Sequence, residues 1–149
     1  MTWLARHAPA VEALASGVTA IAAVAALIGI QVQLSATDRI QRMQSAREAY
    51  RSHLALAVTT PQFAQPKDAC QLLDSDQSGA YTSFIDHLLY SAEQMLAVSE
   101  GWDETFLEQL NPHRDYFCST NGPQGDTIET QQLLAKFRAQ SCDALPSCP

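Results

Sequence analysis

One uncharged stretch dominates the hydrophobic pattern of the chain. From Ala13 to Thr37 no side chain is charged, and most residues are apolar or small. A helix of this length reaches roughly 37 Å, whereas the hydrocarbon layer of a bilayer is about 30 Å thick. The pattern therefore predicts one transmembrane helix over residues 13–34, preceded by a short segment of residues 1–12.

A cleaved secretory signal is the alternative, because Arg6 precedes the apolar run and small residues follow it. The apolar core of a signal is shorter, about 7–15 residues, and a cut after Ala36 would place the large Leu34 where a small residue is required. The stretch is also rich in Ala, where a lone helix facing lipid favours larger apolar side chains. This composition indicates a protein neighbour in the membrane.

Helical character continues beyond the apolar stretch. From Ala36 to about Thr59 the chain has no Gly or Pro and consists of good helix formers, until Pro61 and Pro66 interrupt the pattern. We expect a juxtamembrane helix over residues 35–60.

One stripe of residues, spaced alternately by four and three, runs through both predicted helices with the spacing of a left-handed coiled coil. Its small residues in the membrane would let another helix approach closely. An Ala-rich helix also offers small residues in other registers, and Arg47 fits poorly in a dry seam. The residues predicted to pack against a partner are Ala15, Thr19, Ala22, Ala26, Gly29, Ile40, Met43, Tyr50 and Leu54.

Residues 61–141 predict a small acidic helical domain. An irregular connection with a short turn around DACQLL leads into a helix over residues 81–98, whose apolar residues recur at helical spacing. We expect Gly101 to take a left-handed conformation after this helix. The apolar face contains Phe84, Ile85, Leu88, Leu89, Ala92, Met95 and Leu96.

Capping residues mark three further helix starts. Asp103 precedes the stretch ETFLEQL, and Asn111 with Pro112 begins a helix that includes HRDYFC. Asp126 and Glu129 resemble a capping box at the start of a last helix. Its apolar stripe contains Ile128, Leu133, Leu134 and Phe137.

No segment shows the alternation typical of a strand, so the expected fold class is all-α. One transmembrane helix continues into the long juxtamembrane helix, and a small domain of about three to four helices follows. Residues 142–149 are expected to form a flexible tail.

The charges that flank the apolar stretch predict its orientation. Arg39, Arg42, Arg47 and Arg51 follow it, whereas Arg6 and the amino terminus precede it. The positive-inside rule therefore places the amino terminus outside and the carboxyl-terminal domain in the cytoplasm. Beyond these arginines the chain has thirteen acidic and four basic side chains, which disfavours nucleic acid as a partner.

The four cysteines favour the opposite orientation. Cys70, Cys118, Cys142 and Cys148 all lie after the apolar stretch, and an even number would suit two disulfides in an exported domain. Against the four arginines, we expect reduced cysteines in the cytoplasm and keep a periplasmic, disulfide-bonded domain as the alternative. Sequence alone does not decide which cysteines would pair.

The stretch DSDQSG, from Asp74 to Gly79, matches the first half of a calcium-binding EF-hand loop. Such a loop requires a bidentate Glu at its twelfth position, where this chain has Ile85. We therefore interpret the stretch as a solvated turn that caps the helix beginning near Tyr81, and we expect no metal site.

Two other clusters contain chemically capable side chains. His87 beside Asp86 has no third partner at helical spacing, and the stretch NPHRDYFCS places Arg114 four residues before Cys118, where a cation could activate a thiol. Inward packing of Tyr116, Phe117 and Cys118 is the simpler interpretation. Phosphate loops, serine elbows and zinc motifs do not occur in the sequence, so we expect neither enzyme activity nor a cofactor.

Three stretches together, AREAYRSHLALAVTTPQFAQP, YTSFIDHLLYSAEQML and NPHRDYFCS, resemble a loosely defined group of bacterial single-span membrane proteins with a small helical domain. The resemblance spans residues 46–119 and implies the bacterial inner membrane, without an established activity. The matching positions are Tyr50, Leu54, Pro61, Tyr81, Phe84, Leu88, Leu89, Glu93, His113, Tyr116 and Cys118.

These patterns predict a non-enzymatic accessory or scaffolding subunit. Its transmembrane helix would pack against and stabilise a larger integral membrane protein complex within the lipid bilayer. The alternative is a self-associating, membrane-anchored signalling or regulatory protein that forms a homodimer.

Overall fold

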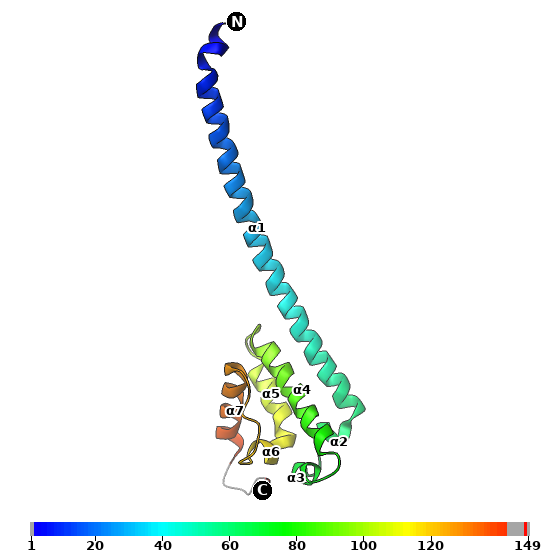
Figure 1. Cartoon of the computed structure of the whole chain (residues 1–149). Coiled ribbons are helices and arrows are strands. Elements are labelled where there is room, and N and C mark those ends of the chain that lie inside the picture. Colours follow the sequence, from blue (N-terminus) through cyan, green and yellow to red (C-terminus); the bar gives the residue numbers. More distant parts are fainter. Residues whose placement is uncertain (1, 143–147, 149) are drawn as a thin grey trace. The chain divides into compact units, whose positions relative to one another are not determined.

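The computed structural model describes residues 2–142 and 148, with side chains from residue 16 onward (Figure 1). The described residues form helices and contain no strand, so the all-α prediction is confirmed. In chain order the elements are α1 (Thr2–Thr59), α2 (Pro61–Ala64), α3 (Ala69–Leu73), α4 (Ser78–Leu96), α5 (Asp103–Leu110), the 3₁₀-helix η1 (Asn111–His113), α6 (Arg114–Phe117) and α7 (Ile128–Ser141).

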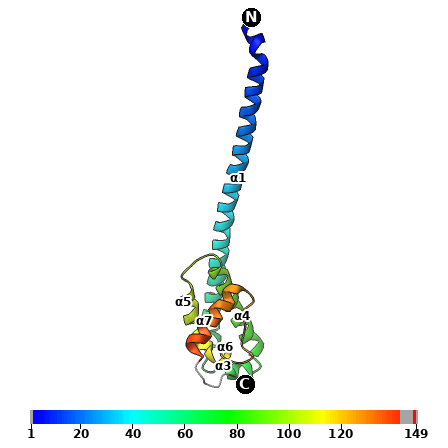
Figure 2. The ribbon, with the colours of Figure 1, turned by 90° about the vertical axis from the view of Figure 1, so that its left-hand side faces the viewer.

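The chain divides into two compact units, residues 1–41 and residues 42–149. Helix α1 belongs to both, because it continues from Thr2 to Thr59 without a break, as two views show (Figures 1 and 2). Pro61 ends this run: its ring removes a backbone N–H, and the chain restarts as the single turn α2 with Pro61 in the first helical position.

The first unit contains only the amino-terminal part of α1. From Ser16 onward this helix is long and apolar enough to cross a membrane. Its large apolar side chains are exposed, so the described part of the unit buries no core of its own. These side chains include Val18, Ile21, Val24, Leu27, Ile28, Ile30, Val32 and Leu34.

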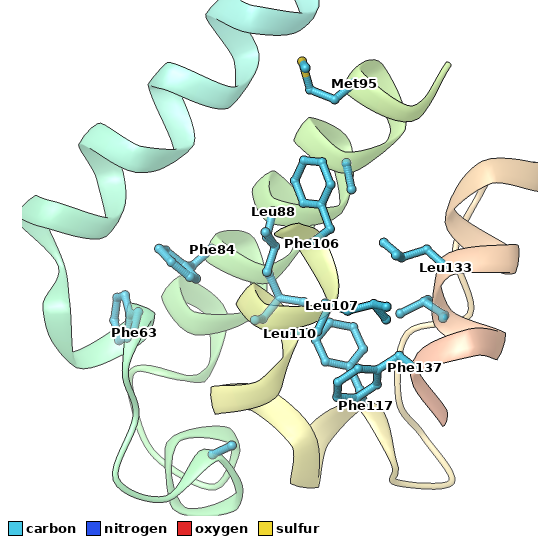
Figure 3. Packing of buried hydrophobic residues seen from close by; sticks show 14 of the residues in the cluster. Phe63, Phe84, Leu88, Met95, Phe106, Leu107, Leu110, Phe117, Leu133 and Phe137 are labelled. Atoms are coloured by element: carbon cyan, nitrogen blue, oxygen red, sulfur yellow. The ribbon is translucent and has the colours of Figure 1, made fainter. Parts of the chain in front are cut away.

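The second unit is a small helical domain around one hydrophobic core. Figure 3 shows side chains of α4, α5, α6 and α7 meeting in this core. Phe117 and Phe137 pack edge to face with ring centroids 5.9 Å apart, and Ala46 of α1 is fully buried against the cluster. The carboxyl-terminal part of α1 therefore serves as one wall of the domain.

Several predicted boundaries differ from the structure. Helix α4 begins at Ser78, three residues before Tyr81, and ends at Leu96. Gly101 has the expected positive φ of 83°, but it lies in the loop after the helix. Asp103 is the first residue of α5 and not its cap, because the N-cap position is Trp102.

The predicted capping box of the last helix is displaced by one residue. Thr127 is the N-cap of α7 and forms reciprocal hydrogen bonds with Thr130, whereas Asp126 and Glu129 were expected in these roles. Ile128 is 69% exposed, because at 3.6 residues per turn it lies on the opposite side of the helix from Leu133 and Phe137, and its predicted place in the apolar stripe is wrong. The other three stripe residues, Leu133, Leu134 and Phe137, are buried as predicted.

Candidate functional site

The residues predicted to contact a partner occupy two different environments. Thr19, Ala22, Ala26 and Gly29 are exposed on α1, and a side chain added at Gly29 would meet no atom within 4 Å. The side chain of Ala15 lies outside the described residues.

The remaining residues of the predicted stripe lie further along α1, and those after Gln41 belong to the second unit. Ile40 is 58% exposed and Met43 is half-buried. Tyr50 packs edge to face against Trp102 and Phe106, with ring centroids 5.1 and 5.7 Å away. This part of the stripe is therefore used at least partly by the chain's own core.

A cavity of about 180 Å³, about half open to solvent, lies where α1, α2, α4, α5 and η1 of the domain come together. Its lining combines apolar side chains with imidazole and carboxamide groups. The lining contains no ionisable carboxylate, lysine or arginine. The residues are His53, Leu54, Ala57, Ala64, Gln65, Phe84, Leu88, Gln109 and His113.

Two residues of this lining have a buried polar atom without a hydrogen-bond partner in the protein: Nδ1 of His53 and Oε1 of Gln109. The carboxamide nitrogen of Gln109 donates to the hydroxyl of Tyr50 at 2.8 Å, so only its oxygen is left over. A buried polar atom without a partner costs about 1–3 kcal/mol. Neither atom has appreciable accessible surface, so both lie behind the lining and are not open to the cavity.

Aromatic rings hold the two cavity histidines in place. Phe84 lies between them, with its ring centroid 5.0 Å from that of His53 and 6.0 Å from that of His113. His53 also stacks on His87 at 5.7 Å. Both cavity histidines are almost completely buried, with exposed fractions of 4% for His53 and 1% for His113.

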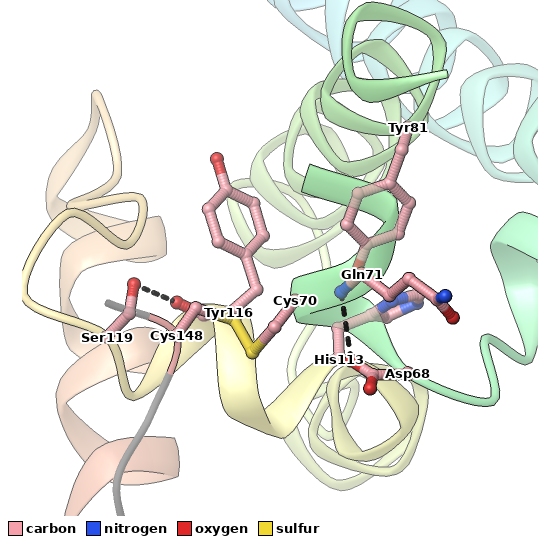
Figure 4. The surroundings of a disulfide bond; sticks show 8 residues. All are labelled: Asp68, Cys70, Gln71, Tyr81, His113, Tyr116, Ser119 and Cys148. Atoms are coloured by element: carbon pink, nitrogen blue, oxygen red, sulfur yellow. Dashed lines mark hydrogen bonds between the residues drawn. A yellow bond between two sulfur atoms is a disulfide. The ribbon is translucent and has the colours of Figure 1, made fainter. Parts of the chain in front are cut away.

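His113 is neutral at physiological pH. Burial, with a smaller contribution from His53, lowers the pKa of His113 to about 4. Nδ1 of His113 lies 2.9 Å from the hydroxyl of Tyr81, and burial raises the pKa of that phenol, so the phenol is protonated as well (Figure 4). The resulting pair is uncharged, which matches the lack of charged groups around the cavity.

A second hollow, of about 350 Å³, lies on the other side of α4. Three of its lining residues are acidic, Asp86, Glu93 and Asp126, and Tyr90 and Tyr116 lie beside them. No buried, unpaired polar atom belongs to its described lining. It is an acidic surface depression whose geometry points to no particular ligand.

The expectation of reduced cysteines is wrong, because the structure pairs all four. Cys70 bonds to Cys148, with Cα atoms 5.1 Å apart (Figure 4). Cys118 bonds to Cys142, with Cα atoms 5.5 Å apart. Both distances suit a disulfide. Cys118 therefore has no thiol for Arg114 to activate, and Cys148 in the predicted flexible tail is 7% exposed.

The acidic stretch that begins at Asp74 does not form an EF-hand loop. Helix α4 starts at Ser78, the fifth position of the motif, and the twelfth position, Ile85, is fully buried in the core. Within the described residues no three His, Cys, Asp or Glu side chains are grouped so that they could hold a metal ion.

His53 and Gln109 were not singled out from the sequence. The signal for His53 was present, because it lies seven residues after Ala46 and three after Tyr50, on the face of α1 that packs into the domain. Gln109 had no comparable signal: its role depends on contact with Tyr50, 59 residues earlier in the chain.

Comparisons of the chain with protein-family models, with curated proteins and with solved structures find no significant match. The class that the structure itself defines is a small disulfide-bonded helical domain carried by a long apolar helix. The resemblance to bacterial single-span proteins stays an expectation.

Proposed function

We propose that the chain is a non-enzymatic, single-span accessory subunit that packs against and stabilises a larger membrane protein complex. The observation that carries the proposal is the exposed apolar surface of α1, where the side chains from Val18 to Leu34 have no core to enter. Exposure of this surface to water would be unfavourable, because removing apolar surface from water stabilises a protein by about 25 cal/mol per Å². A bilayer and a neighbouring helix would cover it.

We propose further that the helical domain faces an oxidising compartment, which in a bacterial cell is the periplasm. Paired cysteines support this orientation, because disulfides persist in exported proteins and are rare in the cytosol. The four arginines after the apolar stretch favour the cytoplasm. The disulfides carry more weight here, because the charge rule is a bias, and long domains are translocated largely regardless of charge.

The partner face can be tested with a matched pair of variants. Ala22→Leu with Gly29→Leu enlarges the small-residue stripe, and Ala20→Leu with Gly17→Leu makes the same exchanges on the opposite side of the helix. Membranes that contain each form are extracted with mild detergent and separated by size. We expect the parent and the control pair to migrate in one large assembly and the stripe variant to be released from it.

A parent protein that migrates alone would contradict the accessory role, and a stripe variant that stays in the assembly would contradict the proposed packing face. Resistance of the parent to alkaline extraction of the membranes tests the anchor separately. Extraction into the alkaline supernatant would show that α1 does not span the bilayer.

A self-associating regulator is the second candidate, and the continuity of α1 favours it. One unbroken helix contains both the exposed apolar stretch and the buried residues Ala46 and His53. A photo-crosslinking amino acid in place of the exposed Ile40 separates the two candidates. A homodimer would yield a product of twice the chain's mass, whereas an accessory subunit would yield a product with a different protein.

A further inference from the structure

We propose that Arg39 and Arg42 bind the phosphate groups of anionic phospholipids, in the leaflet at the carboxyl-terminal end of the apolar stretch. The proposal rests on the membrane anchor proposed above, because it requires α1 to cross a bilayer. It depends neither on a partner protein nor on which compartment contains the helical domain. The place of the two arginines on α1, the geometry of the helix and the surrounding charges all favour it.

The two arginines closely follow the apolar stretch of α1. This helix is continuous through both positions, and Leu34 is the last large apolar residue before the first charged one, Asp38. At about 1.5 Å per residue, Arg39 and Arg42 lie about 8 and 12 Å beyond Leu34 along the helix. The headgroup layer on one side of a bilayer is about 5–8 Å thick. Arg39 would therefore lie at the outer edge of this layer, and Arg42 would lie one turn of the helix further out.

Helix geometry directs both side chains back toward the bilayer. In an α-helix the Cα–Cβ bonds are tilted toward the amino-terminal end. In α1 this end contains the apolar stretch. Both arginines are exposed, so neither side chain is held in the domain core. Their long side chains can reach the headgroups with the charge in polar surroundings, and a guanidinium can hold a phosphate by two parallel hydrogen bonds.

The charges around the two arginines limit the effect to the membrane surface. Asp38 offsets one of them, so residues 38–42 have a net charge of +1. Arg47 and Arg51 lie about 20 and 26 Å beyond the last large apolar residue of the stretch. Both are thus more than a Debye length of about 8 Å outside the headgroup layer.

The rest of the chain does not suit an anionic surface. Beyond Arg51 thirteen acidic side chains face four basic ones, so anionic lipid would repel the domain. In the orientation that the disulfides favour, the arginines after the apolar stretch also oppose the positive-inside rule. A bond to anionic headgroups gives Arg39 and Arg42 a role there that the charge rule does not.

Photoactivatable lipids test the proposal on the full-length protein. The protein is reconstituted in phosphatidylcholine vesicles with a trace of crosslinkable phosphatidylglycerol, which is anionic, or of crosslinkable phosphatidylcholine, which has no net charge. We expect the parent to crosslink about fivefold more to phosphatidylglycerol, the effect of one net positive charge near an anionic lipid. Arg39→Gln with Arg42→Gln should abolish this preference, and Asp38→Asn should increase it.

Arg47→Gln with Arg51→Gln is the matched control. It removes the same charge from the same helix, but further from the bilayer, so the preference for phosphatidylglycerol should remain. A similar loss in both double variants would overturn the proposal, because it would show an effect of net charge alone. Inorganic phosphate should change the preference no more than chloride at equal ionic strength. A specific loss in phosphate would overturn the lipid assignment in favour of free phosphate.

An alkaline wash of the same vesicles separates this proposal from the anchor on which it rests. Parent protein that stays in the washed vesicles but crosslinks equally to both lipids would overturn the role of Arg39 and Arg42 and leave the anchor intact. Parent protein that is lost in the wash would overturn both. We expect the parent and both double variants to stay in the vesicles, because none of the exchanges alters the apolar stretch.

Discussion

At the scale of single residues, His113 makes the stability of the domain depend on pH. Its pKa is lowered from the ordinary 6.5 to about 4, so between these values the unfolded chain binds a proton that the folded chain does not. The contribution of His113 to the free energy of unfolding should therefore be fully present above about pH 6.5. It should decrease as the pH falls toward 4. The loss from this residue is about 3 kcal/mol at most.

Denaturant unfolding of the parent and of His113→Gln at pH 7 and pH 4.5 measures this contribution. The variant should lose less stability between the two pH values, because it has no imidazole at position 113 to protonate. Tyr81→Phe is the matched control: it removes the hydroxyl 2.9 Å from Nδ1 but keeps the buried imidazole, so its pH dependence should persist. Equal pH dependence in the parent and in His113→Gln would show that His113 is protonated in both states.

The sequence could predict part of this environment. Phe117 was expected to pack inward, and it is fully buried. The cavity could not be predicted, since it depends on how His53, Phe84 and Gln109 meet across three helices. Such contacts depend on tertiary packing, which the periodicity of each separate helix does not specify.

At the scale of elements, Arg138 holds the loop between α6 and α7. Its guanidinium donates hydrogen bonds to the backbone carbonyls of Phe117 and Pro123 and to the side-chain oxygen of Gln124. These bonds satisfy the carbonyl of the last residue of α6 and that of Pro123 in the irregular segment that follows it. Arg138→Met should lower the free energy of unfolding by about 2–4 kcal/mol, since bonds from a charged donor are worth about 1.5–3 kcal/mol each and part of the side chain stays exposed.

Lys136→Met provides the control on the same helix. Lys136 pairs with Glu104 at 2.7 Å on the surface, and an exposed pair of this kind contributes little to stability. In thermal unfolding, the melting temperature of Arg138→Met should be well below that of Lys136→Met. Similar melting temperatures would mean that the loop is held by other contacts.

Most helices could be predicted from periodicity and from Pro and Gly positions, whereas their first residues could not. Thr127 and Asp126 are both good capping residues, and only the contact between Thr127 and Thr130 selects one of them. Helix α4 likewise begins within a stretch of turn-forming residues, because the core contacts of Tyr81 and Ile85 extend the helix toward its amino end.

At the scale of the whole molecule, the disulfides should supply a large share of the domain's stability. They link cysteines 78 and 24 residues apart, and the chain-entropy estimate for loops of this size is about 3–5 kcal/mol each. We expect reduction to lower the melting temperature strongly. Thiol labelling of the purified, unreduced protein should modify none of the four cysteines. Four reactive thiols in that experiment would instead support the cytoplasmic location.

The disulfides were not predictable because charge and cysteine count pointed in opposite directions. Four arginines favoured a reducing compartment, while an even number of cysteines favoured an oxidising one. The pairing itself depends on the fold, which brings α3 close to the chain end at Cys148.

The bond between Cys70 and Cys148 also changes how the chain responds to cleavage. Any single backbone cut between these residues leaves two fragments that are still covalently joined, because one contains Cys70 and the other contains Cys148. The loop closed by Cys118 and Cys142 lies entirely within this larger ring. Only a cut before Cys70, as in the connection after α1, would break the covalent link between α1 and the rest of the domain, and the buried residues of α1 such as Ala46 would then be held by packing alone.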